Sequence, residues 1–453
     1  MTSYRVRTHP DSGASEPDNL QLLDWAPGSP AANIQLGNRA GLRFFNGWRA
    51  PREAVDLFLL GAAVYCADKT TRRDVTADAW TRELSVELPV ADVDSWKAAP
   101  WSETLDFLTG DRWTLTPYGE TRSPMDGVRH VPDDVAPVGE VDAVSLFSGG
   151  LDSLTGVVDL LEEDPDRRLC LISHNEGDQA STAQKRLVAA LRAHYGEHRL
   201  EVRSLFLRPA PASARQYLPL PDGRETTTRA RSMLFLTAGL ALAASIGSDV
   251  PVYIPENGFI GINVPLTRAR SGSYSTRTTH PQFLSLLREA ANRVGVHNPI
   301  VNPFRLKTKG EILAGSRNPD LLRRLAPHSV SCSHPEAARY VGREQGNCGY
   351  CFPCLIRRSS MARVGWDSAV GYAWDALSGR DLLDRKTRRA ADLRAVINGV
   401  YADRPDRDIF RNGPIPDREH REFLRVWRSG IAELRAWFDG ATDATGDIVR
   451  GLK

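Results

Sequence analysis

The stretch of sequence that decides the fold is Val144-Ser145-Leu146-Phe147-Ser148-Gly149-Gly150-Leu151-Asp152-Ser153. It opens on a short, mostly apolar run of the kind that forms a buried strand. Two glycines follow, and a helical pattern then occupies residues 154–161. Glycines let the backbone turn tightly against an anion, and the first amides of a helix attract negative charge. The order of strand, glycine-rich loop and helix therefore predicts a phosphate-binding loop.

The polar side chains of this loop suit the same purpose. The hydroxyls of Ser148 and Ser153 can donate hydrogen bonds to phosphate oxygens. Asp152 falls in the first turn of the predicted helix, where a carboxylate either caps the helix or helps to hold a phosphate-bound Mg²⁺. A tight turn with a helix cap is the simpler alternative, because Gly, Ser and Asp are also the usual turn residues. The complete string after an apolar strand favours the phosphate loop.

The sequence on either side of the loop alternates between strand and helix patterns. Strands are predicted at residues 144–147, 169–173, 200–207, 252–255 and 300–304, with helices between them. The strongest helix pattern covers residues 226–246 and has a broad apolar face. Strands that alternate with helices form right-handed crossovers and a mostly parallel sheet. We therefore predict an α/β domain over residues 138–365.

Two further parts flank this domain. Residues 1–137 combine helix patterns at 52–67 and 96–108 with strand patterns at 82–88 and 113–117. These patterns predict a separate α+β domain, joined to the next by a linker rich in Pro, Asp and Gly at 122–140. Residues 366–453 are helical in pattern and rich in Arg, so we expect a helical C-terminal extension with a solvated charged face.

The composition is that of an ordinary globular protein without a strong overall charge. The chain has 453 residues, of which 41% are hydrophobic and 25% are charged. Its 58 basic and 56 acidic residues give a net charge of +2, so no field over the whole protein favours a nucleic acid or a membrane surface. The first residues lack a leader pattern, and no segment approaches the roughly 18 apolar residues of a membrane span. We expect a cytoplasmic protein with no membrane partner.

The cysteines that stand close together in the sequence are Cys332, Cys348, Cys351 and Cys354. Four thiolates complete a tetrahedral Zn²⁺ site and leave no position for water, so we predict a structural zinc ion. An iron–sulfur cluster is the alternative, because cysteine spacing does not decide the metal. His334 is an alternative ligand to Cys332, but a neutral histidine beside such a site more often forms hydrogen bonds around the ligands than binds the metal. Cys66 and Cys170 fall in apolar runs and are expected in the core.

The string Ser148-Gly149-Gly150-Leu151-Asp152-Ser153 resembles the signature of the PP-loop ATP pyrophosphatases, which have an adenine nucleotide α-hydrolase-like fold. It lacks the Gly-Lys-Ser/Thr of the Walker loop. The resemblance implies that ATP with Mg²⁺ is cleaved between its α and β phosphates, leaving an adenylated substrate and pyrophosphate. It assigns the whole string to ATP binding, and Ser148, Asp152 and Ser153 also to catalysis.

Together with the cysteine string, the loop resembles the 7-cyano-7-deazaguanine synthase (QueC) family over residues 144–358. Arg231-Ser232-Met233-Leu234-Phe235-Leu236 resembles a helix start of that family, which places Arg231 near the nucleotide phosphates. Lys307-Thr308-Lys309-Gly310-Glu311-Ile312 resembles another family segment and implies a catalytic role for Lys309. Without the resemblance, a solvent-exposed charge is the better interpretation of both basic residues.

The resemblance also implies the reaction. The family adenylates 7-carboxy-7-deazaguanine, lets ammonia displace AMP to form an amide, and then adenylates the amide and expels water to give a nitrile. The implied ligands are therefore ATP and 7-carboxy-7-deazaguanine or a related deazapurine, and the implied activity is C–N ligation.

The chain departs from the family pattern in three places. The family's Tyr-Pro-Asp-Cys-Arg-Pro-Glu-Phe run appears only as Thr276-Arg277-Thr278-Thr279-His280-Pro281-Gln282-Phe283. The interval between Cys332 and Cys348 is longer, and a long N-terminal part precedes the loop. These differences resemble the QueC-like proteins of bacterial antiphage operons, in which the acceptor amine belongs to a protein. We therefore expect a partner protein as acceptor, docked by residues 1–137; stabilisation of a homodimer is the alternative role of these residues.

Other functions stay open at this point. One is a housekeeping 7-cyano-7-deazaguanine synthase that uses ammonia. A second is a PP-loop enzyme that modifies RNA bases, which would need a redox-active cysteine near the loop and a basic surface. A third is a binding protein without turnover, which would have no need of both glycines and both serines of the loop.

Overall fold

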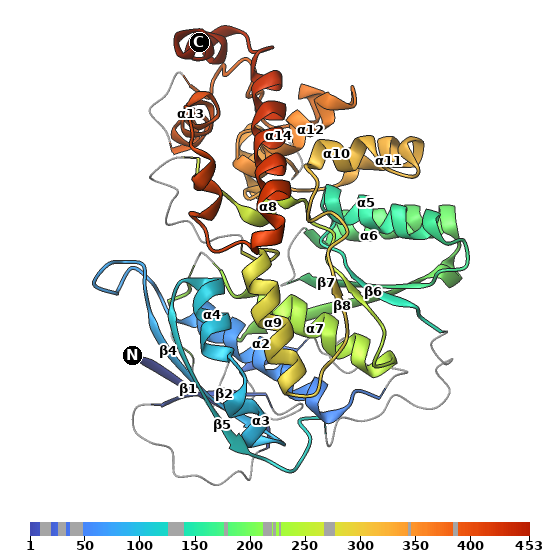
Figure 1. Cartoon of the computed structure of the whole chain (residues 1–453), viewed down its shortest axis with the longest axis vertical. Helices are drawn as coiled ribbons and strands as arrows, with labels where there is room; N and C mark the ends of the chain where they lie inside the picture. Colours follow the sequence, from blue (N-terminus) through green and yellow to red (C-terminus); the bar gives the residue numbers. More distant parts are fainter. Residues whose placement is uncertain are drawn as a thin grey trace.

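The structure of the chain is a computed structural model that describes residues 1–9, 20–25, 33–36, 49–125, 140–175, 180–211, 220, 223–225, 228–266, 277–342, 346–383 and 388–453. It contains two sheets with helices packed around them (Figure 1). The expected α/β architecture with parallel sheets is therefore confirmed. Most of the predicted linker at 122–140 lies outside the described residues.

The larger sheet has six strands in the order β10-β9-β6-β7-β8-β3. Their bounds are Ile34–Leu36 for β3, Ala143–Leu146 for β6, Leu169–Asn175 for β7, Leu200–Pro209 for β8, Val252–Tyr253 for β9 and Ile300–Val301 for β10. The strands predicted from the sequence form its parallel part, and β3 adds an antiparallel edge to β8. Chain order reverses between β6 and β9, because β7 and β8 lie on one side of β6 and β9 and β10 on the other. Open α/β sheets bind ligands beyond the carboxyl ends of the strands at such a point.

Successive residues of the central strands are buried on opposite faces of this sheet. Leu171 packs in a hydrophobic cluster with α5 (Leu151–Glu163) and α6 (Ala180–Tyr195). Its neighbour Ile172 packs in a second cluster with α7 (Arg231–Ile246). Strand side chains point alternately to the two faces, so a sheet covered on both sides requires continuous apolar runs like those in the sequence.

The smaller sheet belongs to the N-terminal part and has the order β2-β1-β4-β5. Its strands are β1 at Thr2–Arg7, β2 at Leu20–Asp24, β4 at Glu83–Val90 and β5 at Arg112–Gly119. All three pairs of neighbours run parallel, which differs from the expected α+β arrangement. The reason is the helical crossover from β4 to β5, which returns the chain to the same end of the sheet. This crossover contains α3 (Val93–Ala98) and α4 (Trp101–Thr109) in place of the single predicted helix, because Pro100 disfavours a helical conformation at Ala99.

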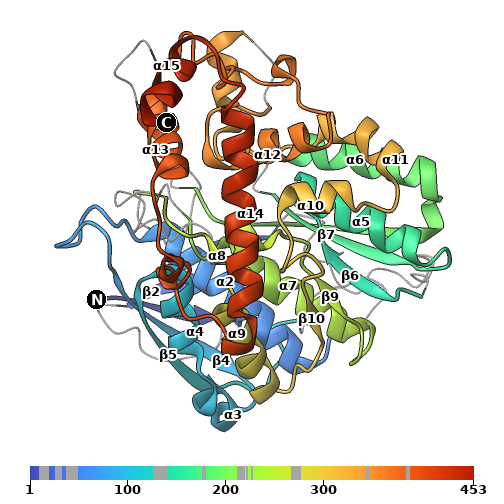
Figure 2. The same cartoon turned by 45° about the horizontal axis from the view of Figure 1, so that its top comes forward.

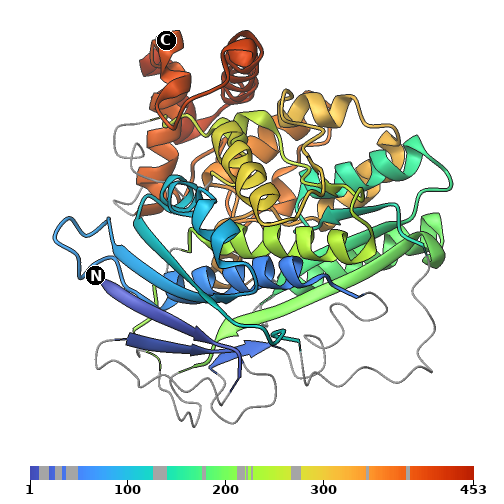
Figure 3. The ribbon, with the colours of Figure 1, turned by 60° about the horizontal axis from the view of Figure 1, so that its bottom comes forward.

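Helix α2 (Arg52–Thr70) joins the N-terminal part to the larger sheet. It lies beside α7 and is buried along nearly its whole length (Figure 3). Gly61 allows the two helices to approach closely, because a Cβ atom there would lie 1.9 Å from Thr237 Oγ1. One hydrophobic cluster contains residues of both sheets and of both helices. Residues 1–137 therefore share a core with the larger sheet, whereas the sequence predicted a separate domain.

The C-terminal part is helical, as predicted, and surrounds another hydrophobic cluster. Its helices are α12 (Phe352–Arg363), α13 (Arg388–Tyr401), α14 (His420–Phe438) and α15 (Asp443–Leu452). The long helix α14 contacts α12 and also α8 (Gly258–Ile262) and α10 (Lys309–Ala314), which follow β9 and β10 (Figure 2). Three of the clustered cysteines belong to this core. None of the helices in the described part of the chain has the length and apolar character that a membrane crossing requires.

Candidate functional site

The glycine-rich loop lies between the end of β6 and the first turn of α5, in the predicted order. Gly149 has a φ angle of +78°, a backbone conformation that residues other than glycine rarely adopt. A Cβ atom at Gly149 would also lie 2.9 Å from Gln184 Cγ. Gly150 is the N-cap of α5, and its carbonyl oxygen accepts the first helical hydrogen bond from Leu154 N. The loop thus turns on Gly149 and presents the start of a helix at its tip.

The two serines of the loop lie side by side. Ser148 is exposed, and its Oγ lies 3.2 Å from Ser153 Oγ. Ser148 Oγ also accepts a hydrogen bond of 3.3 Å from Gly150 N, whereas Ser153 Oγ donates to Gly150 O at 3.0 Å. The loop therefore combines hydroxyl groups with the first amides of α5, which is the donor set that phosphate oxygens need.

Asp152 and Lys309, two residues to which the resemblance assigns catalysis, meet in the structure. Lys309 Nζ lies 3.2 Å from Asp152 Oδ1, and Asp152 Oδ2 accepts a hydrogen bond of 2.6 Å from Asn257 Nδ2. Asp152 Oδ1 accepts no hydrogen bond in the described structure, so its contact with the ammonium group is ionic. Lys309 is the first residue of α10, whose start is fixed by a capping box between Thr308 and Glu311.

A second carboxyl group, which the sequence analysis did not identify, belongs to the same site. Glu256 follows β9 and precedes Asn257, the residue that binds Asp152. Burial raises the pKa of Glu256, and the negative charge of Asp152 raises it further. Thr279 Oγ1 donates a hydrogen bond of 2.6 Å to Glu256 Oε2. The sequence feature that could have identified Glu256 is its position directly after a predicted strand, because the carboxyl ends of parallel strands meet at one edge of the sheet.

Arg231 is the first residue of α7 and lies at the carboxyl end of β7. Its guanidinium group donates to His174 Nδ1 and to the His174 carbonyl oxygen, both at 3.3 Å. His174 Nε2 lies 2.9 Å from the carbonyl oxygen of Leu207 and must donate to it, so Nδ1 carries no proton. Burial and the charge of Arg231 lower the pKa of His174 to about 4. The contacts described for Arg231 are thus with β7, and its predicted contact with nucleotide phosphates stays a prediction.

The N-terminal part holds the start of α7 in place. Asp68, near the end of α2, accepts hydrogen bonds from Arg229 N at 2.8 Å and from Ala230 N at 2.9 Å. These amides precede the first turn of α7, where a carboxylate is favourable. The other oxygen of Asp68 pairs with the buried guanidinium groups of Arg73 and Arg82. A residue of the N-terminal part therefore positions the helix that begins with Arg231.

A cavity of about 550 Å³ lies between α6 and the larger sheet, next to the loop. Phe147 and Leu171 form part of its wall on the sheet side, and Gln184 and Val188 line it from α6. Gln184 Nε2 donates a hydrogen bond of 3.1 Å to Ser148 O, so this wall is connected directly to the loop. The volume suits a small organic ligand, and apolar and polar side chains line the cavity in equal number.

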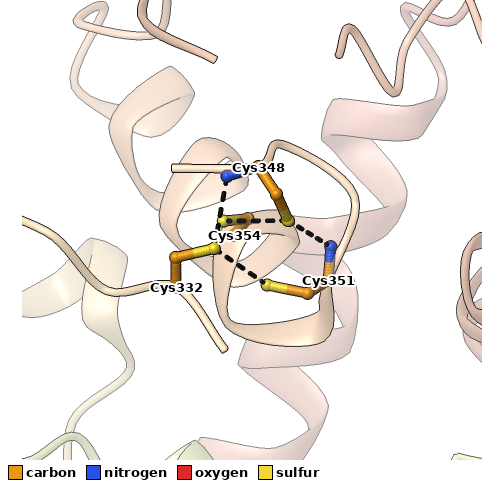
Figure 4. Close-up of side chains that lie close together, drawn as sticks. All are labelled: Cys332, Cys348, Cys351 and Cys354. Carbon is orange, nitrogen blue, oxygen red and sulfur yellow. Dashed lines mark hydrogen bonds between the residues drawn. The ribbon is translucent and has the colours of Figure 1, made fainter. Parts of the chain in front are cut away.

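The four cysteines of the sequence cluster converge at the start of α12 (Figure 4). Their sulfur atoms all lie within 4.8 Å of one another. Cys332 Sγ is 3.8 Å from Cys351 Sγ, and Cys348 Sγ is 3.9 Å from Cys354 Sγ. Zn–S bonds of about 2.3 Å in a tetrahedron require sulfur atoms about 3.8 Å apart. The cluster therefore has the geometry of a metal site.

The surroundings of the sulfur atoms also fit a metal ion. Cys332 Sγ accepts hydrogen bonds from His334 N at 3.3 Å and Cys348 N at 3.2 Å. Backbone amides that point at sulfur stabilise thiolates. Hydrogen bonds from Cys332, and then from Cys348 and Cys354, hold the pKa of the Cys351 thiol well below its ordinary value. The His334 ring stacks on Tyr350 instead of joining the group, and this set can bind a metal ion such as Zn²⁺ without it.

Cys66 and Cys170 are buried in the core, as predicted. The run Arg277 to Phe283 leads into the first turn of α9 (Pro281–Arg293), and Thr276 lies outside the described residues. In this run Thr279 contacts Glu256 and His280 caps the helix. The run that departs from the family pattern therefore lies beside the site.

Comparison of the chain with protein-family models, with curated proteins and with solved structures finds no match. The functional argument therefore depends on the residues of the site and on their arrangement.

Proposed function

We propose that this chain is an ATP pyrophosphatase that adenylates 7-carboxy-7-deazaguanine and joins the product to an amine. We further propose that the amine belongs to a partner protein, in a role in antiphage defence. The single observation that supports the proposal best is the position of the loop at the reversal of strand order. At this point Asp152 of the loop pairs with Lys309, and its charge acts on the carboxyl group of Glu256.

The residues suit the first half of this reaction. The amides of the loop and the hydroxyls of Ser148 and Ser153 would hold the pyrophosphate group of ATP. Lys309 would balance its charge, and Asp152 with Glu256 would bind the Mg²⁺ that neutralises phosphate oxygens. The substrate carboxylate oxygen attacks the α-phosphorus while the bond from that phosphorus to the pyrophosphate oxygen breaks. Donors placed where charge develops on pyrophosphate lower the barrier to this step.

The second half needs an amine held close to the acyl-adenylate. The amine nitrogen forms a bond to the acyl carbon, the bond from that carbon to AMP breaks, and the amine loses one proton. Positioning of the amine accounts for much of such a rate, because it replaces a bimolecular encounter with an intramolecular one. The cavity beside Phe147 and Gln184 is a candidate place for the purine ring of either ligand.

The products of ATP cleavage test the proposal directly. Full-length protein with Mg²⁺, ATP and 7-carboxy-7-deazaguanine should release AMP and pyrophosphate, and should do so only when the carboxylate is present. The Gly150→Leu variant should be inactive, because a Cβ at Gly150 already lies 3.2 Å from both Ser148 Oγ and Ser331 Oγ. Release of ADP and inorganic phosphate would contradict the proposal.

The acceptor needs its own experiment. Mass spectrometry of proteins co-expressed with the chain should find one that gains the mass of a deazaguanine acyl group, and the Gly150→Leu variant should abolish the gain. Deletion of residues 1–137 is not a suitable test, because it would remove α2 from the core that it shares with α7. Amide or nitrile formation from ammonia alone would favour the housekeeping reaction instead.

A further inference from the structure

The segment that precedes the first cysteine of the cluster lies against the glycine-rich loop. Val330 N donates a hydrogen bond of 2.9 Å to Gly149 O. Ser331 Oγ accepts a hydrogen bond of 3.1 Å from Leu151 N, the first amide of α5. The first amides of a helix have no partner within the helix and normally need one from outside. Ser331 supplies that partner, and the next residue along the chain is Cys332.

A residue beside the second cysteine holds Ser331 in place. Asn347 immediately precedes Cys348. Its Oδ1 accepts a hydrogen bond of 3.1 Å from Ser331 N, and its Nδ2 donates one of 3.1 Å to Ser329 O. The side-chain amide of Asn347 therefore forms hydrogen bonds with the backbone on both sides of residue 330.

The helix that carries the fourth cysteine holds the same segment. Arg357 lies on α12, one turn after Cys354, and is 2% exposed. Its guanidinium group donates hydrogen bonds of 2.7 Å to Ser329 Oγ and of 2.6 Å to Ala326 O. Parts of the chain that contribute three different cysteines thus fix residues 329–331 against the loop.

The hydroxyl group of Ser331 can also donate a hydrogen bond to a ligand. A hydroxyl group has one proton to donate as well as lone pairs that accept. Because Ser331 Oγ accepts from Leu151 N, its proton is left for another acceptor. Ser331 Oγ and Ser148 Oγ both lie 3.2 Å from the position of a Cβ atom at Gly150, so the two hydroxyls border the same residue.

We infer that Ser331 is a phosphate-binding residue of the site, and that residues 329–332, the segment that ends at the first cysteine of the cluster, hold it there. Metal binding at the four cysteines and anion binding at the glycine-rich loop are then coupled, and such coupling is reciprocal. Zinc increases the affinity for the anion, and the anion slows the loss of zinc. The inference rests on the proposed function, because it takes the loop to be a pyrophosphate site.

The first test measures binding of pyrophosphate with Mg²⁺ by calorimetry, with the zinc-loaded full chain. The Ser331→Ala variant should bind at least about tenfold more weakly, as expected for one lost hydrogen bond to a charged group. Ser331→Thr, which keeps the hydroxyl, should bind much more tightly than Ser331→Ala. Ser333→Ala is the matched control, because Ser333 is exposed on the other side of Cys332 and should leave binding unchanged. Equal zinc content and equal thermal unfolding would show that the variants are folded.

The second test follows the transfer of zinc to a coloured chelator. Pyrophosphate should slow this transfer in the wild-type chain and should have little effect in Ser331→Ala. Equal binding by wild type and Ser331→Ala, with equal protection of zinc, would overturn the inference and leave the proposed function standing. Failure of the wild-type chain to bind pyrophosphate or ATP at all would instead overturn both.

Discussion

Lys309 Nζ lies 3.2 Å from Asp152 Oδ1, and the two side chains are only 5% and 10% exposed. The pair joins the first turn of α5, after the central strand, to the first turn of α10, after the edge strand. Buried charges are costly unless each is compensated by its neighbours. The site holds one ammonium group and the carboxyl groups of Asp152 and Glu256, so removal of Lys309 leaves two carboxyl groups without their cation.

Replacement of Lys309 should abolish ATP cleavage. In Lys309→Met the side chain keeps its length, but no cation faces Asp152 or the phosphates, so we expect at least a hundredfold loss of carboxylate-dependent pyrophosphate release. Lys307→Met is the matched control, because Lys307 is exposed and its ammonium group lies over the ring of Phe304. Similar activity of the two variants would argue against a role for Lys309.

The Glu256→Gln variant should separate stability from function. The raised pKa of Glu256 means that the folded chain binds more protons than the unfolded chain just above the ordinary pKa of a glutamate. Wild-type stability is therefore lost as pH rises through that interval. The free energy of unfolding of Glu256→Gln, relative to wild type, should increase with pH and stay higher at neutral pH. The same variant should lose stabilisation by Mg²⁺ and ATP.

Urea unfolding between pH 4 and pH 8 provides this measurement. Glu289→Gln, at an exposed position of α9, serves as the control and should follow the wild type. A Glu256→Gln chain that is less stable than wild type at neutral pH would contradict the destabilising effect assigned to the half-buried Glu256 carboxylate.

His174 should contribute an acid-dependent loss of stability. Its pKa is lowered to about 4, so the unfolded chain binds more protons than the folded chain between about pH 6.5 and pH 4. The contribution is fully present above this interval and is lost as pH falls through it. His174→Gln, which can still accept from Arg231 and donate to Leu207 O, should flatten this part of the stability profile. His297→Gln, at an exposed position, should leave the profile unchanged.

Loss of the carboxyl group of Asp68 should destabilise the whole chain. Asp68→Ala leaves two amides at the start of α7 without their acceptor and leaves Arg73 and Arg82 with less negative charge around them. We expect a loss of about 3–5 kcal/mol in the free energy of unfolding. Asp74→Ala removes an exposed partner of Arg72 and should have little effect. Equal unfolding curves for the two variants would show that the buried network does not matter.

Elemental analysis should find about one zinc ion per chain. Replacement of Cys348 or Cys354 by serine should remove it, and Cys170→Ala, outside the cluster, should keep it. Burial raises the pKa of Cys66 and of Cys170, so neither thiol should react quickly in the folded, zinc-loaded chain. Iron with a visible absorbance band would identify an iron–sulfur cluster instead.

The sequence alone determined the features that depend on neighbouring residues. The apolar run before Ser148 predicted β6, and the two glycines predicted the turn, because strand burial and backbone freedom are local properties. Cys348, Cys351 and Cys354 follow one another at intervals of three residues, so their approach to one another was also predictable. The parallel sheet followed from the alternation of strands with helices.

Only the tertiary structure decided which distant segments meet these features. Glu256 reaches Asp152 because β9 pairs with β6, and no local pattern specifies that pairing. Asp68 caps α7 because α2 is buried against it, so the predicted boundary at residue 137 does not separate two cores. Ser331 reaches Leu151 because residues 329–332, which end at Cys332, pack against the start of α5. Each of these contacts is fixed by the burial of apolar surface far from it in sequence, which depends on the whole chain and not on the pattern of any one segment.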